Sequence, residues 1–179
     1  FLYVVLVGAY SLYFKRIPFF DAFFLTLLYM LRICIGLLVI DYSTLSQAAV
    51  IFSFFFFFFL VLVKRHTELL LYVNSLEDNP TGRGYKMENI NLIRSLIVAS
   101  ALISLVVLGL YISSPKVQTL YTSPTYLWAV EFLCLLWCAN LIVCVQKGKM
   151  HNDPIVFAFT NKISLALFFI CIFFIVLSL

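Results

Sequence analysis

The strongest constraint on the fold is a series of apolar runs, each close to the length that crosses a bilayer. A transmembrane helix needs about 20 predominantly apolar residues. Of the 179 residues, 64% are hydrophobic and 11% are charged, whereas a soluble domain has about 45–50% and about 25%. We therefore expect an integral membrane protein, and the net charge of +4 does not indicate a nucleic-acid partner. The predicted full spans are Phe19–Ile40, Leu45–Val63, Leu92–Ile112, Tyr126–Val145 and Ile163–Leu179.

A shorter apolar run, Phe1–Tyr13, is predicted to be the end of a truncated helix. It has no initiating Met, no basic leader and no cleavage site, so it is not typical of a signal peptide. We expect that an upstream part of the protein is missing. The predicted fold class is an all-α, multi-pass transmembrane bundle, with five full spans and one truncated N-terminal span in a single domain.

The basic residues predict the orientation of this bundle. The connections at 14–18, 64–91 and 146–162 hold nine Lys and Arg residues, whereas the alternate connections near 41–44 and 113–125 hold only Lys116. Because cytoplasmic loops carry an excess of Lys and Arg, we expect the three basic connections to be cytoplasmic. The loop at 64–91 would then lie over the mouth of the bundle.

Ionisable residues inside the predicted spans need a specific explanation, because a charge near the bilayer centre costs about 2.5–3.5 kcal/mol. Arg32 lies midway along its span, and Asp21 lies three helical turns earlier on the same face, about 16 Å away. Together they predict a polar stripe, although Arg32 bonded to neighbouring carbonyls as a structural peg is the alternative. Glu131 is expected to make structural hydrogen bonds.

Two further apolar features have ordinary explanations. The run Phe54–Phe59 points all round a helix, so we expect lipid-facing and interhelical packing, with an aromatic slot for an isoprenoid chain as the alternative. The five cysteines all lie inside apolar runs and are predicted to be buried free thiols.

The densest polar cluster is Lys64-Arg65-His66-Thr67-Glu68, at the end of a predicted span. If the helix continues to about Tyr72, then Lys64, Glu68 and Tyr72 share one face. Two cations and a carboxylate suit a phosphate or a metal–pyrophosphate. The alternative is a set of snorkelling charges at the headgroup layer.

Two other connections carry groups that suit phosphate. In Thr81-Gly82-Arg83-Gly84-Tyr85 the glycines allow close backbone approach to an anion, and Arg83 can bind it through two N–H groups. A flexible connector is the alternative. The last connection supplies Lys147, Lys149, His151 and Asp153 before Pro154.

These motifs resemble the UbiA superfamily of intramembrane prenyltransferases over nearly the whole chain. The early pieces are Tyr10-Ser11-x-x-x-Lys15, Asp21 and Leu31-Arg32-x-x-x-Gly36. The later pieces resemble the branch of decaprenyl-phosphate phosphoribosyltransferases and the bacterial fusions of a haloacid-dehalogenase-type domain to a UbiA domain. They are Lys64-Arg65-x-x-Glu68, Gly82-Arg83-Gly84-Tyr85 and Gly148-Lys149-Met150-His151-Asn152-Asp153-Pro154.

The resemblance implies a nine-helix bundle, of which this chain would form part of the fourth helix and all of the fifth to ninth. It implies Mg²⁺ as cofactor and a bacterial inner membrane. Two departures stand out. The family's first aspartate-rich, metal-binding motif is absent from this segment, so the metal ligands are unknown and we expect the segment alone to be inactive. The second motif is Lys64-Arg65-x-x-Glu68 in place of Asp-x-x-x-Asp, which favours the phosphoribosyl branch.

The resemblance thus implies a transferase that joins a polyprenyl phosphate to the ribose of phosphoribosyl pyrophosphate and releases pyrophosphate, in cell-envelope biosynthesis. Glu68 is the candidate catalytic residue. The candidate substrate-binding residues are Lys15, Asp21, Arg32, Lys64, Arg65, Gly82, Arg83, Gly84, Tyr85, His151 and Asp153. Two alternatives stay open: an aromatic prenyltransferase of quinone or haem biosynthesis, and a non-catalytic membrane subunit or transporter segment.

Overall fold

A computed structural model describes residues 2–39, 46–75, 84–148, 150 and 153–179, and this part of the chain is helical without any strand. The main helices are α1 (Leu2–Leu12), α2 (Phe20–Val39), α3 (Gln47–Ser75), α4 (Ile90–Ile112), α6 (Tyr126–Gln146) and α8 (Lys162–Ser178). Shorter pieces are the 3₁₀ turns Phe14–Arg16 and Met87–Asn89 and the helices α5 (Pro115–Leu120) and α7 (Pro154–Thr160).

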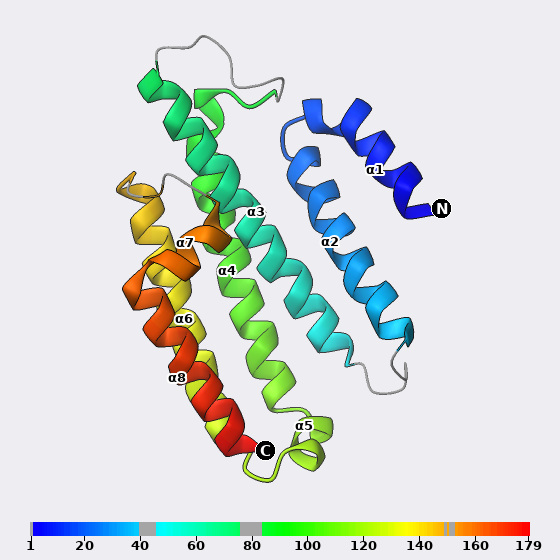
Figure 1. Ribbon diagram of the computed structural model, residues 1–179, viewed down its shortest axis with the longest axis vertical. Coiled ribbons are helices and arrows are strands. Elements are labelled where there is room, and N and C mark those ends of the chain that lie inside the picture. Colours follow the sequence, from blue (N-terminus) through cyan, green and yellow to red (C-terminus); the bar gives the residue numbers. More distant parts are fainter. Residues whose placement is uncertain (1, 40–45, 76–83, 149, 151–152) are drawn as a thin grey trace.

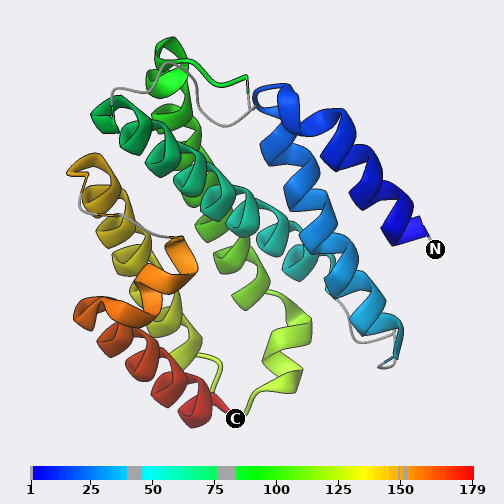
Figure 2. The same ribbon diagram turned by 45° about the horizontal axis from the view of Figure 1, so that its top comes forward.

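The long helices pack side by side as a bundle (Figure 1). Helices α3 and α4 form its most extensive contact, α2 packs on α3, and α1 packs on α2. On the other side, α6 joins α4 to α8. Figure 2 shows the α1–α2 pair at one flank and the α6–α8 pair at the other. The all-α bundle predicted from the sequence is confirmed.

Of the five predicted full spans, the described residues support three or four. Within the part of the chain that the structure describes, three helices are long and apolar enough to cross a membrane, namely Gln47–Leu71 within α3, Met87–Ile112 and α6, and the bent pair α7–α8 would make a fourth. The predicted span at 163–179 corresponds to α8, whose axis makes an angle of 84° with that of the preceding helix α7. Helix α2 has 20 residues, about 30 Å of helix, and stays a predicted span.

The bends have local causes. Asn161 ends α7 with an extended backbone, and its side-chain Oδ1 accepts the N–H groups of Ile163 and Ser164 to begin α8. Between the 3₁₀ turn and α2, Ile17 is extended before Pro18, and Phe19 takes the left-handed conformation with φ of 65°. The left-handed conformation is strained for a bulky residue, so contacts with neighbouring residues must stabilise this turn.

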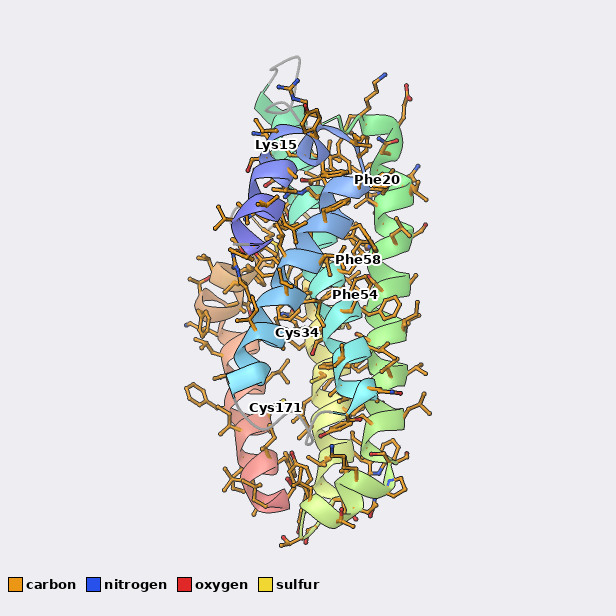
Figure 3. The ribbon with its side chains drawn as sticks, turned by 90° about the vertical axis from the view of Figure 1, so that its right-hand side faces the viewer. Lys15, Phe20, Cys34, Phe54, Phe58 and Cys171 are labelled. Atoms are coloured by element: carbon orange, nitrogen blue, oxygen red, sulfur yellow. The ribbon has the colours of Figure 1, made fainter. Side chains whose placement is uncertain are left out.

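The phenylalanine run makes several contacts with other helices, whereas mainly lipid-facing packing was the favoured prediction. Phe59 is fully buried. Phe56 stacks on Trp137 of α6, and Phe57 stacks on Tyr29 of α2. Phe54 and Phe58 stack on each other with centroids 6.2 Å apart (Figure 3). The run therefore joins the two flanks of the bundle. Cysteine burial was predicted too broadly: Cys138 is buried, whereas Cys34 is exposed.

Candidate functional site

A buried ion network links α2 to α3. Arg65 Nε lies 2.6 Å from Asp21 Oδ2, and both side chains are almost completely buried, at 2% and 0% exposure. These two atoms form a close ion pair without the alignment of a hydrogen bond. Arg65 Nη1 also donates to Glu68 Oε2 one turn further along α3. The second oxygen of Asp21 accepts a 2.6 Å hydrogen bond from the Tyr10 hydroxyl of α1.

A second pair ties α3 to the start of α7. Lys64 Nζ donates to Asp153 Oδ2, while Asp153 Oδ1 accepts the N–H of Ile155 and so caps α7. Burial alone would raise the pKa of Asp153, but the Lys64 ammonium and the Ile155 N–H stabilise the carboxylate, so its pKa is lowered. Beside this pair, Met150 is buried, with its Sδ 3.4 Å from Thr67 Oγ1.

The start of the segment after residue 83 folds back onto the turn before α2. The N–H of Gly84 donates to the carbonyl of Arg16 at 3.2 Å, and a Cβ on Gly84 would lie 2.6 Å from that oxygen. Tyr85 is buried, and its hydroxyl accepts the N–H of Phe19 at 3.0 Å. Burial raises the pKa of Tyr85 to about 12, so its hydroxyl stays protonated and holds the strained turn.

This geometry changes the role expected of Gly84. The glycine was predicted to open its backbone N–H to an anion, but that N–H is bound to Arg16 and the missing side chain makes room for the neighbouring backbone. The position of the 64–91 loop over the mouth of the bundle stays a prediction, because residues 76–83 lie outside the described residues. The predicted loop at 64–91 is shorter than expected, since α3 continues as a helix to Ser75.

Most of the described candidates therefore gather at one end of the bundle. The α1–α2 turn and the far end of α3 lie at the same end of the bundle (Figure 1), and Figure 3 labels Lys15 near that end. Lys15 is half-buried in the 3₁₀ turn. Among these groups, Glu68, Lys64 and Asp153 are accessible, with side-chain exposures of 31%, 39% and 33%. The side chains of Asp21 and Arg65 are buried.

Arg32 departs from the predicted arrangement. Asp21 and Arg32 do share the stripe expected on α2, because both contact α1, Asp21 through Tyr10 and Arg32 through a 2.7 Å bond from Nε to the Tyr3 hydroxyl. Arg32 nevertheless stays exposed, with its guanidinium 5.4 Å from the rings of both Tyr3 and Tyr29. The contacts of Arg32 are thus with Tyr3 and Tyr29 and not with the Asp21–Arg65 pair, and its substrate-binding role stays a prediction.

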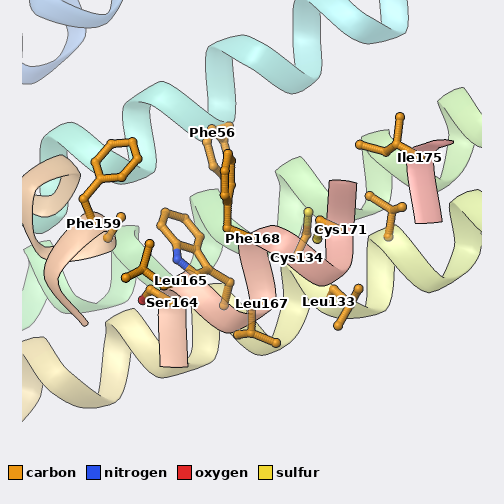
Figure 4. A pocket seen from close by; sticks show the side chains of 13 residues that line it. Phe56, Leu133, Cys134, Phe159, Ser164, Leu165, Leu167, Phe168, Cys171 and Ile175 are labelled. Atoms are coloured by element: carbon orange, nitrogen blue, oxygen red, sulfur yellow. The ribbon is translucent and has the colours of Figure 1, made fainter. Parts of the chain in front are cut away.

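Close to the bundle's C-terminal flank lies an apolar cavity of about 340 Å³. Its walls come from α3, α6, α7 and α8 and include Phe56, Cys134, Trp137, Phe168 and Cys171 (Figure 4). Its lining is almost wholly apolar, apart from the Ser164 hydroxyl and the cysteine thiols. The cavity suits a hydrocarbon chain.

Three candidates, Gly82, Arg83 and His151, lie outside the described residues. Two other polar groups were given no site role from the sequence: Tyr10, which was quoted only within a motif and binds Asp21, and Arg94, which lies within the first turns of α4. A tyrosine eleven residues before a buried aspartate carries no local signal. Arg94 was detectable, since it is a cation inside a predicted span.

Magnesium fits the described residues only in part. No group of three or more His, Cys, Asp or Glu side chains among them is arranged to hold a metal ion. Mg²⁺ is commonly held by one or two carboxylates together with substrate phosphates. Glu68, oriented by Arg65, is the carboxylate in this cluster that could supply such a contact.

The described residues form an all-helical bundle with three to four helices long and apolar enough to cross a membrane and a charged cluster at one end. The chain matches no known protein family and no solved structure. It is 32% identical over 163 residues to the uncharacterized protein y4nM of Sinorhizobium fredii (strain NBRC 101917 / NGR234). The match covers 90% of this chain, which spans about a third of that relative's length (31%).

Proposed function

We propose that the chain is part of a UbiA-type membrane transferase that joins a polyprenyl phosphate to the ribose of phosphoribosyl pyrophosphate. The proposal rests on one observation. At one end of the bundle, Arg65 forms ion pairs with Asp21 and Glu68, and Lys64 forms an ion pair with Asp153. These residues come from three elements, and all five were candidates for the same site.

The arrangement suits a reaction between a lipid and a water-soluble anion. The accessible groups lie at the end that carries the basic connections, where an anionic donor would arrive from the cytoplasm. The apolar bundle, with a cavity of about 340 Å³, offers a place for hydrocarbon. Loss of pyrophosphate needs stabilisation of developing negative charge, which fixed cations supply without covalent chemistry.

The accessible residues would then contact the donor, and the buried residues would position them. Lys64 would release Asp153 and bind a phosphate group of the donor in its place. Arg83 is proposed to bind phosphate together with Lys64. Glu68 orients the donor and contacts the Mg²⁺ that the pyrophosphate carries. Arg65 and Asp21 are positioning residues, because a buried guanidinium held between two carboxylates fixes Glu68 but is closed to substrate.

One observation favours a second candidate, a non-catalytic membrane subunit. Both cations of the cluster, Lys64 and Arg65, are already paired with carboxylates. In a non-catalytic subunit these pairs would hold α2, α3 and α7 together. The clamp would then be the whole function of the cluster.

The test is product analysis with the complete gene product in native-like membranes. Labelled phosphoribosyl pyrophosphate and polyprenyl phosphate should yield a labelled lipid-linked phosphoribose and pyrophosphate. A prenylated ring formed from polyprenyl diphosphate and an aromatic acceptor would instead support the aromatic prenyltransferase. No product from either pair, in protein that is folded and lipid-bound, would favour the non-catalytic subunit.

A further inference from the structure

Between α3 and α4, a second arginine is held in place by a buried histidine. Arg94 Nε of α4 donates a 3.1 Å hydrogen bond to His66 Nε2 of α3. His66 is fully buried. Because Nε2 accepts this bond, the imidazole is neutral and carries its proton on Nδ1. The histidine thus fixes the guanidinium through one edge and leaves its two Nη groups for another ligand.

Arg94 lines a shallow groove of about 510 Å³ on the outside of the bundle. Ser95 lies next to it on α4 and Gln146 ends α6, so three polar groups gather at one end of the groove. Its remaining lining is the apolar strip Val98, Ala99 and Leu102 of α4. All three of these are exposed.

The position along α4 matches the border between headgroups and hydrocarbon. Arg94 lies seven residues after Met87, where the membrane-length segment begins, or about 10 Å along the axis. Side chains of a helix lean toward its N-terminus, which for α4 is the end with the basic connections. The guanidinium therefore lies near headgroup level, while Val98 and Leu102 continue into the hydrocarbon region.

The charge of Arg94 is not neutralised by any ion pair within the described part of the chain. An arginine is always protonated, and its planar fork matches two oxygens of a phosphate. Basic sites between helices on the cytoplasmic side of a membrane are suited to anionic lipid headgroups. A headgroup phosphate at Arg94 with an acyl chain on the apolar strip would satisfy both halves of the groove.

We propose that the α4–α6 groove binds one anionic phospholipid, with its phosphate on Arg94 and an acyl chain along Val98, Ala99 and Leu102. This site lies apart from the Asp21–Arg65 cluster and is independent of the proposed transferase activity. His66 is the positioning residue that turns the arginine toward the lipid.

The test is lipid retention by the complete gene product, measured by native mass spectrometry after extraction in mild detergent. The wild-type protein should retain one phosphatidylglycerol in preference to phosphatidylcholine. Arg94→Gln should weaken that retention at least about tenfold, the scale of a lost charge-assisted contact. Ala99→Trp, which fills the apolar strip at an exposed position and leaves the charge unchanged, should weaken it as well.

Lys86→Gln is the matched control, because it removes an exposed cation at the same end, outside the groove, and should leave retention unchanged. Equal retention of both lipids by the wild-type protein would overturn the proposal, and this measurement needs no variant. Displacement of phosphatidylglycerol by millimolar inorganic phosphate would show a free-phosphate site and overturn it too. Equal losses in Lys86→Gln and Arg94→Gln would mean that net charge alone attracts lipid.

Discussion

Removing Arg65 should cost far more stability than removing its partner Asp21, although the two form one ion pair. In Arg65→Met, Asp21 keeps only the Tyr10 hydroxyl and is left as a buried charge without a cation. Breaking a buried pair in this way costs about 3–5 kcal/mol. In Asp21→Asn, Arg65 keeps Glu68, so the loss is closer to that of one charged hydrogen bond, about 1.5–3 kcal/mol.

The double variant Asp21→Leu/Arg65→Met should recover part of the loss, because it leaves no unpaired charge in the α2–α3 contact. The assay is reversible unfolding in mixed micelles, followed by tryptophan fluorescence. Arg16→Met is the matched control, since that arginine is exposed on the neighbouring turn, and it should change stability by less than about 0.5 kcal/mol. Equal losses in the two single variants, or purely additive losses in the double variant, would refute the buried-pair reasoning.

Three further outcomes follow from the geometry. Gly84→Ala should destabilise the protein by about 1–3 kcal/mol, because its Cβ would lie 2.6 Å from the Arg16 carbonyl; a wild-type melting temperature would contradict this contact. The pKa of Asp153 is lowered, so its ion pair stabilises the fold above the ordinary pKa of an aspartate, and this stability is lost as the pH falls through the lowered pKa. Acid should therefore reduce the stability of the wild type more than that of Asp153→Asn. Parallel profiles of stability against pH would count against the pair. Single cysteines at Asn79 and Gln118 should react from opposite sides of the membrane, and labelling from one side would reject the predicted orientation.

Local signals in the sequence predicted the helices and the shared face of two polar residues on α2. The apolar runs predicted every long helix because bilayer thickness sets their length. The three-turn spacing of Asp21 and Arg32 predicted their shared face. The i, i+3 relation between Arg65 and Glu68 likewise follows from helix geometry once α3 continues past Val63.

Tertiary pairing could not be predicted in the same way. Lys64 and Asp153 are 89 residues apart, and their contact depends on how α7 packs against α3. The charges at 64–68 suggested the end of a span, yet the helix continues because Arg65 is neutralised inside the bundle. Residues 154–160, expected as loop, form α7 because Asp153 caps it.

The exposure of Arg32 also depends on a tertiary partner. The energetic rule that an intramembrane arginine faces protein or water led us to place it in one inward-facing polar stripe with Asp21, three turns away. In the structure, Tyr3 supplies the partner from α1, with one hydrogen bond and a ring face. The spacing of polar residues along one helix therefore predicts which face they share, but it does not predict which neighbouring helix contacts each of them.

The most direct test of the proposed transferase compares two glutamates in the complete gene product. Glu68 is held at the charged cluster by Arg65, whereas Glu88 is exposed in the turn before α4. Transfer of label from phosphoribosyl pyrophosphate to polyprenyl phosphate should fall roughly a hundredfold in Glu68→Gln, the scale of one lost electrostatic contact at a reacting group. Glu88→Gln should stay within about twofold of wild type. Equal transfer rates in the two variants would contradict the assignment of the cluster as the site of reaction.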